Sequence, residues 1–145
     1  EPGMALTLNG VAQGFIADRV GALLKARGLS HVLVDTGEFN ALGPQSNGAP
    51  WPVRLTAGGQ VDLTKGALAS SSALGTTFDP EGRVGHILSP LTGRPAPSRW
   101  QLVTITAPSA GLADALSTAA CLMEDRTQIE GALVPFAEAR LAHLA

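Results

Sequence analysis

The clearest hydrophobic pattern in the N-terminal part of the chain predicts a helix over residues 11–27. Its apolar positions recur at the spacing of one helix face, at Ile16, Val20, Leu23 and Leu24. Gly28 follows directly, and glycine is the residue that most readily takes the left-handed conformation in which many helices end. We therefore expect an amphipathic helix whose apolar stripe faces the core.

A second helix is predicted over residues 109–123, and a weaker third one over 127–134. The apolar face of the second helix is expected at Leu112, Leu116, Ala119 and Met123. Between Ser109 and Met123 the sequence holds no Lys, Arg or Glu. A helix face in water usually carries long charged side chains, so the second helix is expected to be covered on its other face as well.

Short runs of alternating or β-branched residues predict strands. They lie at 31–35, 39–42, 53–56, 61–63, 66–72, 102–106 and 140–144, the last as an edge strand. The Gly58-Gly59 pair predicts a hairpin turn between the third and fourth of these runs. No internal repeat or linker divides the chain. The sequence therefore predicts a single α+β domain over residues 1–145.

Composition narrows the functional classes. Hydrophobic residues make up 45% of the 145 positions and charged residues 15%, which excludes intrinsic disorder. A net charge of −2 with no basic stretch argues against a nucleic-acid groove or an electrostatic membrane anchor. No apolar run is long enough for a transmembrane helix. The single Cys121 allows no internal disulfide and no cysteine-based zinc site.

The strongest candidate site lies on the second helix, where Asp114 and Thr118 stand one turn apart on the same face. Ala110, Ser117 and Cys121 flank the pair, and all are small. A sheltered carboxylate needs a cation or several hydrogen-bond donors. A carboxylate beside a hydroxyl oxygen suits a hard ion such as Mg²⁺. The alternative is that Asp114 simply accepts hydrogen bonds from a neighbouring loop.

A second candidate is the glycine-containing start of the first helix, at residues 9–14. Free N–H groups at a helix N-terminus attract phosphate, and glycine allows close approach. An ordinary helix start explains the same residues.

Two loops complete the candidates. Thr36-Gly37-Glu38 follows a predicted buried strand, where ligands often meet a sheet, although a plain turn also fits. His86 could accept a proton near neutral pH, and Thr92-Gly93 could form a turn that faces phosphate. Taken alone, His86 is also consistent with an ordinary surface or core histidine that has no catalytic role.

Taken together and in order, five segments resemble motifs of the ApbE family, the FAD:protein FMN transferases. They are LTLNGVAQGF at 6–15, VDTGE at 34–38, ALASS at 67–71, HILSPLTG at 86–93 and ADALSTA at 113–119. The last matches the family motif letter for letter. The resemblance covers nearly the whole chain but only about the C-terminal half of a typical member. It implies an ApbE-like fold with a mostly antiparallel sheet and two or three packed helices.

The resemblance further implies that FAD and Mg²⁺ bind, that FMN is transferred to a threonine of an acceptor protein, and that AMP is released. Mg²⁺ would be held by Asp114, Thr118 and the main-chain carbonyl of Gly10. His86 would accept or relay the proton of the acceptor threonine. Residues expected at the flavin nucleotide are Thr7, Gln13, Gly14, Asp18, Gly37, Glu38, His86 and Thr92. A bacterial periplasmic location, with a lipid anchor in the full-length protein, is also implied.

Three positions depart from the family pattern. Thr7 replaces a usual Asp, Gln13 a usual Lys, and Ser89 the Asp of the Asp-Pro-x-Thr-Gly signature. Each change removes a charge near the expected phosphates or ribose. The departures leave three interpretations open: an excised C-terminal portion, a divergent subfamily, or a member without transferase activity. The alternative function is a flavin- or nucleotide-binding module, or a structural one, without chemistry.

Overall fold

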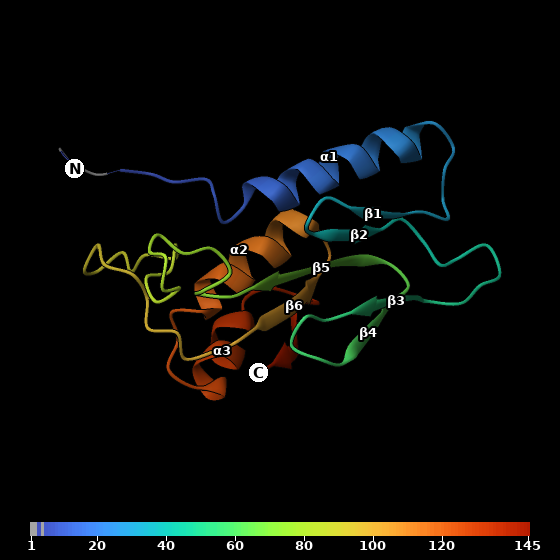
Figure 1. The fold of residues 1–145 in the computed structure, drawn as a ribbon. Coiled ribbons are helices and arrows are strands. Elements are labelled where there is room, and N and C mark those ends of the chain that lie inside the picture. The colour runs from blue at the N-terminus through green and yellow to red at the C-terminus, as the bar shows by residue number, and fades with distance from the viewer. Residues whose placement is uncertain (1–2, 4) are drawn as a thin grey trace.

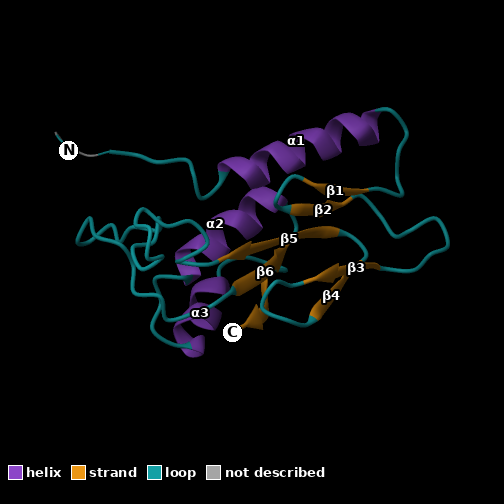
Figure 2. Ribbon diagram, viewed as in Figure 1, coloured by secondary structure: helices purple, strands orange, loops and turns teal. Residues whose placement is uncertain are grey.

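The computed structural model describes residues 3 and 5–145, and its main element is a five-stranded antiparallel sheet (Figures 1 and 2). The strands follow the order β1-β2-β5-β6-β7, and a separate hairpin pairs β3 with β4. The strands are β1 (Leu33–Asp35), β2 (Phe39–Ala41), β3 (Trp51–Arg54), β4 (Gln60–Leu63), β5 (Gly66–Ser71), β6 (Val103–Ala107) and β7 (Arg140–Leu144). The helices are α1 (Ala12–Ala26), α2 (Ala110–Ala120) and α3 (Arg126–Leu133). The predicted α+β class is confirmed.

Strand β5 lies in the middle of the sheet, and its two faces serve different neighbours. Side chains alternate along a strand, so Ala67 and Ala69 point to one face and Leu68 to the other. Leu68 packs with Val53 and Leu63 of the β3–β4 hairpin, while Ala67 and Ala69 belong to the clusters beneath the helices. The same alternation turns Ser71, at the end of β5, toward α2. This position matters for the candidate site.

Helices α1 and α2 cross at very short range on the helix-covered face of the sheet (Figure 1). The residues of α1 that are buried are Gly14, Ala17 and Gly21. A Cβ atom on Gly14 would lie 2.3 Å from the carbonyl oxygen of Ala110. The predicted core stripe of α1 is therefore wrong at Ile16 and Leu23, which are 52% and 64% exposed. Small residues form the contact because only they let the two backbones approach.

The core face predicted for α2 also needs correction. Leu112, Leu116 and Met123 are half-buried and pack at the margin of the main core cluster, but Ala119 is exposed. The most buried residues of α2 are Ala110, Ala113, Asp114, Ser117 and Ala120. This small-residue face is pressed against α1 and β5, as the absence of long charged side chains predicted.

Residues 72–102, between β5 and β6, form a lobe that contains turns and two isolated bridges. Figure 2 shows this segment as a group of loops beside the end of α2. Ile87 and Ala96 are buried in the main core cluster and fix the base of the lobe.

The strand and helix positions expected from the sequence are largely confirmed. The terminal strand β7 lies at a sheet edge as predicted, and α2 ends three residues earlier than expected, at Ala120 instead of residue 123. Gly28 adopts φ +82° directly after the C-cap residue of α1. Within the described residues, no helix combines the length and apolar character needed to cross a membrane. That residues 1–145 form one domain stays a prediction.

The close crossing of α1 and α2 predicts opposite effects for two glycine-to-alanine changes. Gly14→Ala should lower the free energy of unfolding by about 1–3 kcal/mol, because the new methyl group overlaps the Ala110 backbone. Gly131→Ala in α3 is the matched control, since its Cβ would meet no atom within 4 Å. It should raise the free energy of unfolding by about 0.5–1 kcal/mol. Urea denaturation followed by circular dichroism measures both, and equal effects would refute this packing.

Candidate functional site: a buried carboxylate and hydroxyl cluster

The first turn of α1 receives its hydrogen-bond acceptor from α2. The N-cap residue Val11 offers no side-chain cap, and the N–H of Gly14 donates instead to Oδ2 of Asp114 at 3.0 Å. Asp114 is only 4% exposed. A helix N-terminus carries free N–H groups and a partial positive charge, which favour a carboxylate there. The predicted alternative was that Asp114 bonds a neighbouring loop; the partner of its Oδ2 is instead the first turn of helix α1.

Three hydroxyl groups surround the same helix turn. Ser71 Oγ lies 2.7 Å from Ser117 Oγ and 3.2 Å from Thr118 Oγ1. Ser117 is fully buried, and its hydroxyl also donates to the main-chain oxygen of Asp114. The end of β5 therefore meets the middle of α2 through side-chain oxygens.

Gly10 joins this cluster from the turn that precedes α1. A Cβ atom on Gly10 would lie 2.9 Å from Cγ2 and 3.2 Å from Oγ1 of Thr118. Its main chain therefore lies against the Thr118 side chain. The structure thus brings Gly10 next to the pair Asp114 and Thr118 on α2. More than 100 residues separate Gly10 from this pair along the chain. Whether they hold a metal stays a prediction.

Asp18, predicted at the nucleotide, has structural partners for both of its carboxylate oxygens. Oδ1 accepts from the N–H of Ala110 and from Nδ2 of Asn40, each at 2.8 Å, and Oδ2 accepts from Gly111 N–H at 2.9 Å. Asp18 therefore holds the first turn of α2 against α1 and β2. Its contact with a cofactor stays a prediction.

Gln13 and Gly37 lie side by side at the edge of the cluster. A Cβ on Gly37 would come within 3.0 Å of Gln13 Nε2, and Gly37 has φ +98°, which disfavours other residues in this turn. Thr7 is exposed in the segment before α1, and its hydroxyl accepts from Asn9 N–H. The structure thus places Gln13 and Gly37 near the site and Thr7 on the approach to α1.

Burial changes the acid–base properties of two carboxyl groups. The pKa of Glu38 rises to about 8, chiefly because burial disfavours its charged form, with a further contribution from the charge of Asp114. The backbone N–H of Ser70 opposes that rise through a hydrogen bond. Burial also raises the pKa of Asp114, and the Gly14 N–H opposes it. The charge of Asp114 therefore disfavours ionisation of Glu38.

His86 and Thr92 lie on the 72–102 lobe. The His86 ring is exposed, and its Nδ1 is 3.0 Å from the carbonyl oxygen of Thr76. Thr92 is exposed in a turn in which its hydroxyl accepts from Arg94 N–H. Among the hydrogen bonds of the described residues, none joins either side chain to Asp114 or Thr118. The His86 ring nevertheless lies near the end of β5, because a Cβ atom on Gly75 would be 4.0 Å from His86 Cε1 and 3.6 Å from Cβ of Ser72, the residue after Ser71. The roles predicted for His86 and Thr92 stay predictions.

The donor atoms at the cluster suit a hard cation. They are carboxylate, hydroxyl and main-chain oxygens, the types that Mg²⁺ and Ca²⁺ prefer. In the described part of the chain, no three His, Cys, Asp or Glu side chains converge as a metal site, so a cation here would depend on the hydroxyl and main-chain oxygens. Sequence reasoning missed the contact of Ser71 with this helix turn, and it named Ser117 only as a small residue beside the pair. The run of serines that ends β5 and the position of Ser117 within ADALSTA were the available signals.

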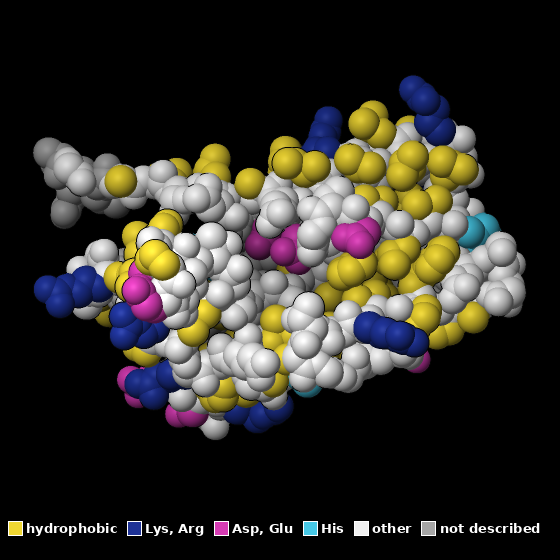
Figure 3. Space-filling view, viewed as in Figure 1, with side chains coloured by type: hydrophobic (Ala, Val, Ile, Leu, Met, Phe, Trp, Pro, Cys, Tyr) yellow, Lys and Arg dark blue, Asp and Glu magenta, His cyan; other side chains and the backbone are white. Residues whose placement is uncertain are grey.

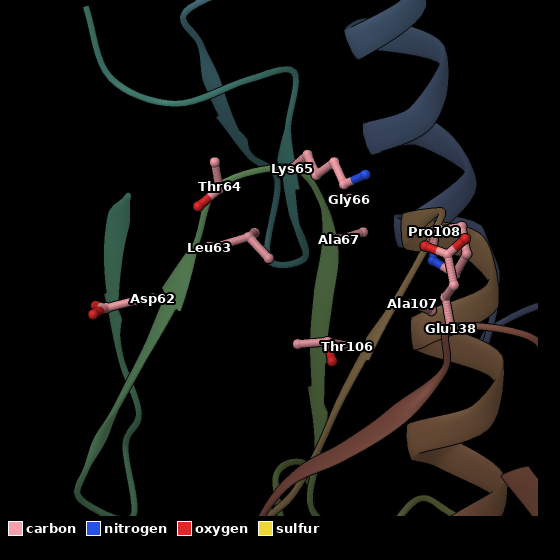
Figure 4. A pocket seen from close by; sticks show the side chains of 10 residues that line it. All are labelled: Asp62, Leu63, Thr64, Lys65, Gly66, Ala67, Thr106, Ala107, Pro108 and Glu138. Carbon is pink, nitrogen blue, oxygen red and sulfur yellow. The ribbon is translucent and has the colours of Figure 1, made fainter. Parts of the chain in front are cut away.

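A surface groove elsewhere on the molecule lies at the opposite end of β5 (Figure 4). Gly66 and Ala67 line it at the start of the strand, with Asp62, Thr106 and Glu138 around them. Ser71 is at the other end of the same strand, so the groove and the cluster are separate.

The shifted pKa of Glu38 predicts how stability depends on pH in metal-free protein. The native state keeps a proton on Glu38 between about pH 4.5 and 8 that the unfolded chain releases, so the free energy of unfolding should fall as pH rises through this window. Glu38→Gln should remove most of this fall, on the order of a few kcal/mol, and leave stability near pH 4.5 almost unchanged. Urea titrations with a chelator measure it. A wild-type slope that persists in the variant would refute the assignment.

Comparisons with known proteins agree with the motifs in the sequence. The ApbE family model matches residues 1–133. The FAD:protein FMN transferase of Escherichia coli K12 is 30% identical over 127 residues, and that of Treponema pallidum is 34% identical over 137 residues. These matches cover 81% and 82% of this chain but 36% and 38% of the relatives. The chain therefore spans little more than a third of their length.

Solved structures show the same relationship. The ApbE protein of Thermotoga maritima aligns with a TM-score of 0.79 at 32% identity, covering 88% of this chain and 45% of that one. The flavinyl transferase ApbE of Pseudomonas stutzeri aligns with a TM-score of 0.68 at 34% identity, covering 81% of this chain and 39% of that one. The sequence motifs, the family match and the shared fold lead to one conclusion: this chain belongs to the ApbE family.

Proposed function

We propose that this chain provides the cation-binding part of a flavin transferase, which moves FMN from FAD to a threonine of an acceptor protein and releases AMP. The observation that supports the proposal most directly is the convergence of Gly10, Asp114 and Thr118 from two distant parts of the sequence. The names of the relatives, FAD:protein FMN transferases, supply the reaction class.

In this proposal Asp114, Thr118 and the carbonyl of Gly10 hold Mg²⁺. The buried Asp114 contributes the negative charge, and the hydroxyl of Thr118 and the main chain of Gly10 contribute neutral oxygens. Bound there, Mg²⁺ would neutralise charge on the pyrophosphate of FAD and so favour departure of AMP. The hydrogen bond from Gly14 N–H fixes the Asp114 carboxylate before any ion arrives.

The transfer step forms one bond and breaks one. The hydroxyl oxygen of the acceptor threonine attacks the phosphorus of the FMN half, and the pyrophosphate bond to AMP breaks. His86 accepts the threonine proton, and the exposed position of its ring leaves it open to an incoming protein. Gln13, Gly14 and Gly37 lie where a nucleotide could approach the start of α1, whose partial positive charge favours phosphate. Thr7, Glu38 and Thr92 complete the proposed set of nucleotide contacts, together with Asp18.

The metal site predicts a specific loss in Asp114→Asn. Asparagine keeps an oxygen for the Gly14 N–H but removes the charge, so the fold should remain and affinity for Mg²⁺ should fall at least about tenfold. Isothermal titration of the protein with Mg²⁺ measures it. Asp62→Asn, an exposed acid on β4, is the charge-matched control and should bind as the wild type does. Equal affinity in Asp114→Asn and wild type would show that the cation lies elsewhere.

The transferase proposal predicts covalent FMN on an acceptor threonine. The full-length gene product, incubated with FAD, Mg²⁺ and a threonine-containing acceptor domain, should add the mass of FMN, as mass spectrometry measures. His86→Ala should slow the transfer by about 10²–10⁴-fold while FAD binding persists. An unchanged rate in His86→Ala would remove that residue from the mechanism.

The second candidate function is a flavin- or nucleotide-binding module without chemistry. It is favoured by the uncharged residues Thr7, Gln13 and Ser89. FAD binding without transfer in the assay above would support this function. If transfer is lost only because these charges are missing, replacing Gln13 by Lys and Ser89 by Asp should restore it.

The acceptor protein and the location are part of the proposal. An acceptor with a target threonine follows from the reaction class, and a periplasmic, lipid-anchored full-length protein follows from the family resemblance. Fractionation of cells that produce the full-length protein tests the location directly.

A further inference from the structure

Glu38 is a buried acid that the function above counts among the nucleotide contacts, but its surroundings suit a different task. It lies in the turn between β1 and β2 and is 6% exposed, and its Oε2 has no hydrogen-bond partner among residues 3 and 5–145. Thr36 Oγ1, two residues away in the same turn, is also buried without a partner. Two unpaired buried oxygens so close in the chain indicate that this turn is shaped for a group other than the protein's own donors.

Two independent contacts place Glu38 beside the Asp114 cluster. Its neighbour Gly37 lies against Gln13, and the next residue, Gly14, donates its N–H to Asp114. On the other side, the backbone N–H of Ser70 bonds the Glu38 carboxyl group. The residue after Ser70 is Ser71, which contacts Ser117 and Thr118. The turn and the cluster are therefore joined through both α1 and β5.

The region collects negative charge without a basic side chain to balance it. The ion pairs of the described residues use Arg83, Arg99 and Arg126, and none involves Glu38 or Asp114. Figure 3 shows acidic side chains gathered in the hollow below α1, with no Lys or Arg beside them in that view. Two carboxylates sheltered from water need a cation between or near them if both are to be charged.

We propose that Glu38 is a positioning residue for the cation site, in which its carboxylate supplies the second negative charge that stabilises a divalent ion held at Asp114. This inference rests on the metal site of the proposed function and assigns Glu38 to the ion instead of to the flavin. Near-complete burial leaves its carboxyl little surface for direct contact with a nucleotide. A charge acting over a short, sheltered distance needs no such contact.

The test uses Mn²⁺ as the probe, without FAD, and the electron paramagnetic resonance signal of the free ion as the readout. Glu38→Gln keeps the shape of the side chain and removes its charge, so Mn²⁺ affinity should fall at least about tenfold. Glu38→Asp restores the charge and should recover most of the affinity. Glu130→Gln on the exposed face of α3 is the matched control and should bind Mn²⁺ as the wild type does. Circular dichroism verifies that each variant is folded.

Each outcome decides a different point. Wild-type affinity in Glu38→Gln, together with a loss in Asp114→Asn, overturns the role of Glu38 and leaves the proposed metal site intact. Equal losses in Glu38→Gln and Glu38→Asp also overturn it, because shape and not charge would then matter. No Mn²⁺ binding by the wild type, or unchanged binding in Asp114→Asn, refutes the metal site and this inference with it. A loss in Glu38→Gln that Glu38→Asp reverses supports the inference.

Discussion

The structure depends on a reciprocal capping of two helices. The Asp18 carboxylate of α1 accepts hydrogen bonds from the first N–H groups of α2. In return, the Asp114 carboxylate of α2 accepts one from the N–H of Gly14 in the first turn of α1. Each helix N-terminus thereby gains the negative partner that its free N–H groups favour. This exchange requires backbones close enough to touch, which Gly14 and Ala17 permit. The same close crossing of α1 and α2 therefore also positions the residues of the candidate site.

Burial at this helix crossing explains why the pKa of Asp114 is raised. An acid that caps a helix from inside the fold loses water as it gains N–H donors, and for Asp114 burial outweighs the single bond from Gly14. Glu38 is also buried, and the charge of Asp114 raises its pKa further. In the proposed function, a bound cation would offset this repulsion.

The 72–102 lobe adds a second, separate element. Its base is fixed by Ile87 and Ala96 in the core, while His86, directly before Ile87, and the outer turn with Thr92 are exposed. In the proposed reaction, the proton acceptor thus comes from this lobe and the cation ligands come from α2 and the turn before α1. A substrate that contacts both would have to extend from the start of α1 toward the lobe.

Most of the helices and strands could be predicted from the sequence alone, as could the burial of the face of α2 that carries Asp114. Apolar spacing placed α1, α3 and the edge strand β7, and the small residues around Asp114 indicated that this face of α2 is covered. The exposure of Ile16 and Leu23 became visible only in the folded chain. The same is true of the contact between Ser71 and Thr118, and of the hydrogen bond that Asp18 accepts from the first turn of α2. Spacing along a helix records which residues share a face. It does not record how closely another backbone approaches, and at this crossing that approach, set by glycine and alanine, decides which groups meet.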